Sequence, residues 1–301
     1  MHTELSFTEK YALLCLDAQE SQHHSTLKKI SLKAISASAL LEEALIKDDL
    51  SSMEASSFRL LLNQLCSVKN HSQKKLDQTE KNLVSILKEK HAIEETPDLL
   101  SCDMNYYTSG VKLMNYRSDA DIYARISECL RAEALEDNSL TEESFCILWL
   151  LRENGLLYDF FSSLEQETLQ KHLTEFSMKC ENYKLLLQTK FHSAGESISN
   201  IFLSTKKKAT ENQFMQGVNL VFPFINRRNS IFIDTVVLGT SSTGRRLEIM
   251  AFLSEHGHFV EDVTLGEEKL LKIDNGYYRL FPTVRVCRIP IQGVALIPVY
   301  H

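Results

Sequence analysis

The sequence predicts a mainly α-helical N-terminal domain followed by a smaller α+β domain. Up to about residue 205, apolar residues recur at three- and four-residue spacing, the period of a helix with one buried face. Beyond residue 213 they alternate with polar residues, as in half-buried strands. The polar stretch STKKKATENQ (204–213) separates the two patterns. With 301 residues for two hydrophobic cores, we expect a helical domain at 1–205 and an α+β domain at 213–301.

The first helices follow from local start signals and from apolar spacing. Ser6 and Glu9 are spaced as a capping box, which predicts a short core helix ending near Leu16. The small and apolar residues from Ser31 onward predict a tightly packed helix that ends near Lys47. Residues 76–93 predict a further helix leading into a short apolar segment, and residues 98–117 look irregular or strand-like.

Two more capping boxes divide the second half of the helical region. Ser139 with Glu142 predicts the start of the apolar helix FCILWLLREN, and Gly155 supplies a natural C-terminal stop. Ser162 with Glu165 predicts the start of one long helix that continues through residue 190.

The C-terminal region contains five stretches typical of strands and one typical of a helix. The predicted strands are 229–240, 258–266, 276–281, 283–287 and 291–300, and the predicted helix is 245–257. The first and last strands could pair with each other, with a partner strand or with a second copy of the chain, so a homo-oligomer is one possibility.

Composition excludes several classes of protein. Seven scattered cysteines without a CxxC pair indicate a reducing compartment rather than a disulfide framework. The N-terminus lacks a basic and apolar leader, and no apolar run approaches the roughly 18 residues that cross a bilayer. We therefore expect a cytoplasmic protein without a transmembrane segment, whose contact with a membrane would be peripheral.

Charge is unevenly distributed along the chain. Residues 213–301 hold 9 of the 33 Lys and Arg and 8 of the 40 Asp and Glu, which leaves 24 basic against 32 acidic residues before them. A net acidic helical domain disfavours nucleic acid as a partner, because neutralising phosphates requires a basic face.

Three passages of the helical region resemble the Golgi phosphoprotein 3 family. They are LSFTEKYALLCLD (5–17), LKAISASALLEEALIKDDL (32–50) and the stretch from ARISECLRAEALEDN to GLLYDFFS (124–162), and they occur in the family's order. The resemblance implies a largely helical fold and, from the family's eukaryotic members, binding of phosphatidylinositol 4-phosphate on Golgi membranes. It does not cover the C-terminal domain.

The resemblance also places the family's headgroup site on this chain, and the site is altered there. The family's tryptophan falls on Lys28, and the arginine of its GLRG-like turn falls on Ala37. Two further arginines fall on Asp77 and Glu80, whose carboxylates would repel a phosphate.

Lysines close to these positions could still form a looser anion-attracting face, since each lysine near an anionic membrane contributes about 1 kcal/mol. The alternative is an ordinary solvated surface. The candidate headgroup ligands are Lys28, Lys29, Lys33, Lys74, Lys75 and Lys81. We expect a non-catalytic peripheral membrane adaptor that binds phosphoinositide or another anionic phospholipid; the alternative is a protein-interaction module on the same fold that has lost headgroup binding.

The loop VVLGTSSTGRR offers a second candidate anion site. Gly244, Arg245 and Arg246 at a predicted helix start could bind a phosphate or carboxylate, as a small-anion sensor or enzyme would, or simply form an N-capped turn. An arginine replaces the phosphate-binding lysine of a P-loop, so nucleotide hydrolysis is not expected. His256 and His258 are metal-ligand types, but no second ligand cluster accompanies them. We expect no cofactor, no metal site and no catalytic residues.

Overall fold

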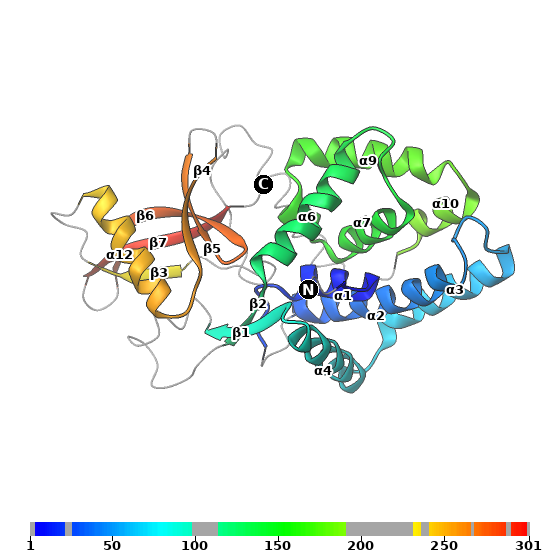
Figure 1. Cartoon of the computed structure of the whole chain (residues 1–301), viewed down its shortest axis with the longest axis horizontal. Coiled ribbons are helices and arrows are strands. Elements are labelled where there is room, and N and C mark those ends of the chain that lie inside the picture. Colours follow the sequence, from blue (N-terminus) through cyan, green and yellow to red (C-terminus); the bar gives the residue numbers. More distant parts are fainter. Residues whose placement is uncertain are drawn as a thin grey trace.

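The computed structural model describes residues 4–21, 26–97, 114–190, 231–235, 241–265, 268–286 and 290–299. The predicted linker at 204–213 lies outside these residues, as do residues 98–113. Figure 1 shows a helical part at one end of the molecule and a five-stranded sheet crossed by one helix at the other. A helical domain followed by an α+β domain is therefore confirmed.

The helical part is built from a series of α-helices with one short hairpin between them. The helices are α1 (Phe7–Leu16), α2 (Thr26–Lys47), α3 (Ala55–Ser67), η1 (Val68–Asn70, a 3-10 turn), α4 (Gln73–Glu89), α6 (Ala120–Leu135), α7 (Glu142–Asn154), α8 (Leu157–Phe160), α9 (Ser163–Ser177) and α10 (Glu181–Gln188). Strands β1 (Ile93–Pro97) and β2 (Met114–Ser118) form the antiparallel hairpin. None of the described helices is both long and apolar enough to cross a bilayer.

Two of the three predicted capping boxes are present. Ser6 accepts from the backbone of Glu9 at the start of α1, and Ser162 accepts from that of Glu165 at the start of α9. Gly155 ends α7 with a φ of 76°, a conformation that costs glycine little.

The capping box predicted at Ser139 is wrong. Helix α7 begins two residues later than that box requires, with Thr141 as N-cap accepting from the backbone N–H of Ser144 at 3.2 Å. The Ser139 hydroxyl instead donates to the main-chain oxygens of Glu133 and Glu136, so it terminates α6 rather than starting α7.

The single long helix predicted after Ser162 is also wrong. Residue Cys180 has extended backbone angles, φ −154° and ψ 160°, which separates α9 from α10. The break allows both Phe176 and Tyr183 to contact Phe145 of the buried helix α7, with ring centroids 4.8 and 5.5 Å apart. Aromatic contacts of this kind favour the broken arrangement over a straight helix.

The C-terminal domain is a five-stranded antiparallel sheet in the order β3-β7-β6-β5-β4, with one face covered by α12. Its elements are β3 (Ile231–Asp234), α12 (Ser242–Glu255), β4 (Val260–Leu265), β5 (Glu268–Ile273), β6 (Gly276–Val286) and β7 (Pro290–Val299). Strands β3 and β7 pair with each other, so the internal pairing is the one observed. Ile249 and Leu253 of α12 are buried against the sheet.

Two features of this sheet differ from the prediction. The stretches predicted as separate strands at 276–281 and 283–287 form one continuous strand, β6. Strand β5 was not predicted. Asp274 and Asn275 join it to β6 through a two-residue hairpin turn, with φ 53° at Asp274. The sequence I-D-N-G-Y is a recognisable signal for such a turn.

Candidate functional site

A cluster of basic side chains lies where α2 and η1 meet the start of α4. The Lys75 Nζ is 2.8 Å from Nε2 of His71, the residue that ends η1. Burial first, and then the charges of Lys75 and Lys33, lower the pKa of His71 below its ordinary value. The imidazole is therefore neutral near pH 7 and reports a positive local potential.

Lys29 extends this cluster, because it is exposed and lies one turn before Lys33 on α2. We call Lys29, Lys33, His71 and Lys75 the lysine cluster. Among the described residues, neither Lys29 nor Lys75 pairs with a carboxylate. Two adjacent helices thus supply ammonium groups to one region of the surface, an arrangement that attracts anions.

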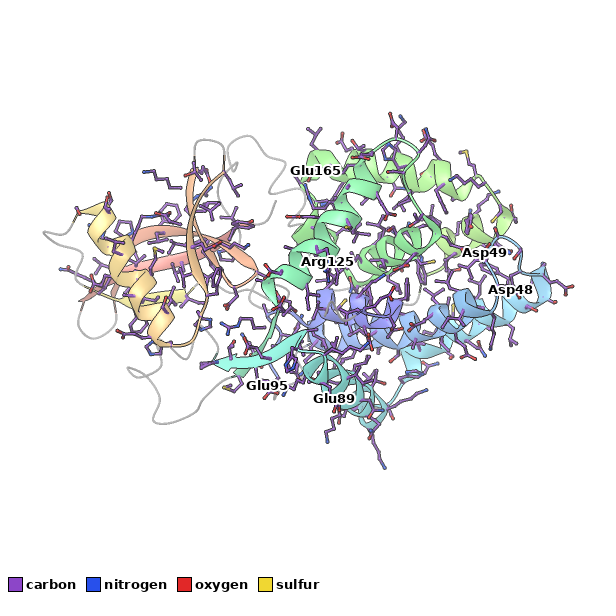
Figure 2. All side chains as sticks on the ribbon, in the orientation of Figure 1. Asp48, Asp49, Glu89, Glu95, Arg125 and Glu165 are labelled. Carbon is purple, nitrogen blue, oxygen red and sulfur yellow. The ribbon has the colours of Figure 1, made fainter. Side chains whose placement is uncertain are left out.

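The other exposed candidates lie on α4 itself. Lys74 and Lys81 are seven residues apart, so they share one side of the helix, and the described residues include no ion-pair partner for either. The far end of α4 is different, since Figure 2 shows Glu89 there together with Glu95 of β1. Lys88 at that end pairs with Glu95, so the lysines of α4 without a described carboxylate partner lie within its first nine residues.

Lys28 does not belong to this surface. Its side chain is fully buried, and its Nζ lies 2.6 Å from the Glu80 carboxylate and 2.5 Å from the main-chain oxygen of Glu20. The Tyr116 hydroxyl donates to Glu80 at 2.8 Å, and burial followed by this hydrogen bond raises the pKa of the phenol. The candidate headgroup set is thereby reduced to four exposed lysines and the half-buried Lys33; the exposed ones are Lys29, Lys74, Lys75 and Lys81.

The same packing closes the place where the family resemblance puts a headgroup. Lys28, Ala37 and Glu80 are all buried, and Asp77 is half-buried. A buried ion pair with additional hydrogen bonds satisfies its own charges. These positions therefore contribute to the core of the helical domain.

The candidate anion site at the start of α12 is occupied by its own side chains. The Ser241 hydroxyl accepts from the backbone N–H of Gly244 at 3.0 Å, which is an N-cap. Arg246 pairs with Asp262 of β4 and donates to the Leu270 main-chain oxygen at 2.9 Å. Arg245 is half-buried and also engaged. These groups cap α12 and join it to the sheet. The arrangement is the one expected if the loop is an N-capped turn rather than an anion site.

The junction between the two domains is a second polar cluster, and sequence reasoning did not identify it. Arg117 of β2 contacts Glu94 at 2.5 Å, Asp274 at 3.1 Å and the main-chain oxygen of Gly257. Asp274 also accepts from His258 Nδ1 at 2.8 Å.

Beside it, Asn275 donates to the Asp17 carboxylate at 2.9 Å and to the main-chain oxygen of Ser118 at 3.2 Å. The hairpin turn between β5 and β6 thus docks on the end of β2. Its D-N-G signal could have predicted the turn, but nothing local indicates where the turn docks.

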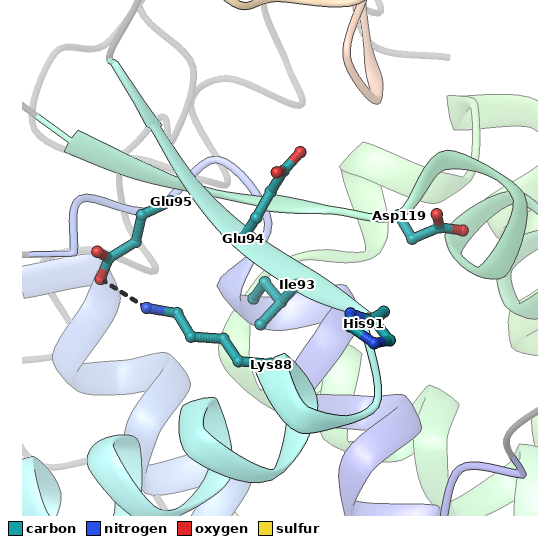
Figure 3. A pocket seen from close by; sticks show the side chains of 6 residues that line it. All are labelled: Lys88, His91, Ile93, Glu94, Glu95 and Asp119. Carbon is teal, nitrogen blue, oxygen red and sulfur yellow. Dashed lines mark ion pairs between the residues drawn. The ribbon is translucent and has the colours of Figure 1, made fainter.

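A cavity of about 520 Å³ opens next to this junction, between the end of α4 and the β1–β2 hairpin. Figure 3 shows its lining, with a 3.4 Å ion pair between Lys88 and Glu95. Glu94 and Asp119 add two further carboxylates. An acidic lining disfavours phosphate, so this cavity is not the anion site. Within the described ranges, no three His, Cys, Asp or Glu side chains are placed to hold a metal ion.

No family model matches this chain, and neither curated proteins nor solved structures provide a match.

Proposed function

We propose that this chain is a non-catalytic adaptor of the Golgi phosphoprotein 3 type that attaches to anionic phospholipid surfaces through the lysine cluster. The proposal rests on the proximity of two lysine ammonium groups to the His71 imidazole. Lys33 lies on α2 and Lys75 on α4. Exposed lysines near an anionic membrane each contribute about 1 kcal/mol. Lys74 and Lys81 add to the same attraction.

This binding would depend on surface charge more than on headgroup stereochemistry. A phosphoinositide would bind because it carries more negative charge, since Lys28 and Glu80 already neutralise each other in the core. The Golgi-type headgroup preference is therefore expected to be weak. Salt should weaken attachment, because exposed charges are screened over a Debye length of about 8 Å at physiological ionic strength.

The test is co-sedimentation of the full chain with neutral vesicles, with phosphatidylserine vesicles, and with vesicles that contain phosphatidylinositol 4-phosphate at equal surface charge. The double variant Lys29→Gln/Lys75→Gln should bind anionic vesicles about 30-fold more weakly, the equivalent of two lysine contributions. The matched control is Lys171→Gln/Lys184→Gln, which removes two exposed lysines of α9 and α10 and should bind normally.

Equal loss of binding in the two double variants would contradict the lysine cluster as the site. Absence of binding to every anionic vesicle would favour the second candidate, a protein-interaction module. That candidate is supported by the buried Lys28–Glu80 pair, which takes the place of a headgroup pocket.

A further inference from the structure

Strand β4 forms one edge of the C-terminal sheet, and no other described strand lies along its outer side. In the order β3-β7-β6-β5-β4, the strand pairs with β5 on one side only (Figure 1). The backbone N–H of Asp274 donates to the main-chain oxygen of Phe259 at 2.8 Å, immediately before the strand begins. In an antiparallel pair, residues that exchange hydrogen bonds alternate with residues whose polar groups point away.

That alternation identifies the groups on the open side. Phe259 bonds to the β5 side, so Val260, Asp262 and Thr264 direct their backbone N–H and C=O groups outward. Within the described part of the chain, these backbone groups have no partner. An edge with three such residues in a row is a template for an added strand.

The side chains of β4 determine which kind of strand could pair with this edge. Glu261, Val263 and Leu265 lie on the sheet face opposite α12, as does Phe259 just before the strand. Phe259 is 47% exposed and Leu265 is 36% exposed. Glu261 lies across from Lys272 of β5, but no ion pair joins them. One exposed carboxylate therefore lies between exposed or half-exposed apolar side chains.

We propose that the open edge of β4 binds an extended protein segment that presents a lysine or arginine opposite Glu261 and apolar residues opposite Phe259, Val263 and Leu265. Opposite charges across neighbouring strands are favourable, and like charges are unfavourable. In antiparallel order the segment has the pattern apolar-x-apolar-x-basic-x-apolar. This site is separate from the lysine cluster and does not depend on the lipid proposal.

A second copy of the chain is a poor occupant of this edge. Antiparallel pairing of two β4 strands centred on Asp262 would place the two Asp262 residues opposite each other. Pairing centred on Glu261 would place the two Glu261 residues opposite each other, and pairing centred on Val263 would place Glu261 opposite Leu265. The first two registers bring carboxylates together, which destabilises the pair, and the third leaves Glu261 without a basic partner. Charge complementarity thus favours a basic partner segment over self-association.

The experiment measures fluorescence anisotropy of a labelled peptide, Val-Thr-Val-Thr-Lys-Thr-Val, with the full chain in solution and without vesicles. A second peptide carries glutamate in place of the lysine. We expect the lysine peptide to bind about tenfold more tightly than the glutamate peptide. In the Glu261→Lys variant the preference should reverse, because the cross-strand charges are exchanged.

A second variant tests whether the backbone edge is used. Thr264→Pro removes an outward N–H that does not belong to the β4–β5 ladder, and edge strands tolerate proline at such positions. It should abolish binding of both peptides, whereas Thr264→Ala should bind as the unmodified chain does. Circular dichroism checks that each variant is folded.

An undetectable affinity for the lysine peptide would overturn the proposal, as would an unchanged preference in Glu261→Lys. The charge-reversal result decides the matter even if Thr264→Pro is unfolded. Because no lipid is present, the outcome is independent of the vesicle test.

Discussion

Lys28 is predicted from the sequence to lie at the surface, but the structure places it in the core. Its sequence context, LKK at the start of a helix, is typical of a solvated turn. Its partners Glu80 and Tyr116 are distant in sequence, and no local pattern predicts that they meet. Nearby Lys29 and Lys75 were placed correctly at the surface because they fall outside the apolar stripes of their helices.

The buried pair leads to a stability prediction. Lys28→Met leaves the Glu80 carboxylate buried without a cation, so we expect the free energy of unfolding to fall by about 3–5 kcal/mol. Adding Glu80→Leu should recover much of that loss, because an apolar pair does not require compensation. Urea denaturation of the two variants and of the unmodified chain measures the difference. A double variant as unstable as Lys28→Met would show that the charge itself is not the cause.

We expect His71 to make the proposed attachment to membranes sensitive to pH. Burial and the charges of Lys75 and Lys33 lower the pKa of His71 in the free protein, whereas a bound anionic surface would raise it. Binding therefore takes up a proton and should strengthen several-fold as pH falls from about 7.5 to below the ordinary histidine pKa of about 6.5, because the pKa in the free protein lies under that value. Co-sedimentation with phosphatidylglycerol vesicles measures this, since a phosphodiester keeps its charge over the range.

His71→Asn should remove this pH dependence, because asparagine can accept from Lys75 but does not titrate. The matched control is His91→Asn at the exposed turn after α4, where φ is 54° and asparagine is tolerated. A steep pH profile in His71→Asn, or a flat one in His91→Asn alone, would contradict the assignment.

At the scale of elements, the helix starts that were predicted correctly depend on pairs of residues within one helical turn of each other. Ser6 with Glu9 and Ser162 with Glu165 each start a helix where predicted. The break at Cys180 was missed because it depends on packing of two helices on Phe145, which is remote in sequence. The docking of Asn275 on Asp17 could not be predicted either, for the same physical reason.

The start of α7 gives a direct comparison of two hydroxyl side chains. Thr141 caps the helix by accepting from the backbone of Ser144, so Thr141→Ala should lower the free energy of unfolding by about 1 kcal/mol. The Ser139 hydroxyl donates only to two main-chain oxygens at the end of α6, and Ser139→Ala should cost less. Thermal denaturation of the two variants ranks them, and the reverse order would restore Ser139 as the cap.

At the scale of the whole molecule, the domains meet through charged and amide side chains. Arg117 reaches across from β2 to Asp274, and Asn275 reaches back to Asp17. Polar contacts of this kind fix an orientation through geometry, and they depend on the ionisation of their carboxylates. The relative orientation of the two domains should therefore be more sensitive to acid than the packing of either hydrophobic core.

Asp274 is the group through which acid would act. Burial alone would raise the pKa of this carboxyl, but the hydrogen bond from His258 and the charges of His258 and Arg117 outweigh it and lower the pKa. A lowered pKa means that the stabilisation is present above the unfolded value of about 3.9 and is lost as pH falls through the folded value.

Asp274→Asn should therefore lower the thermal midpoint at pH 7, and its difference from the unmodified chain should shrink below about pH 4. Glu268→Gln, which removes an exposed carboxylate paired with Arg279, should change the midpoint little at either pH. A deficit in Asp274→Asn that stays constant from neutral to acid pH would show that the asparagine disturbs packing rather than charge, and the ion pair would then not be what joins the two domains.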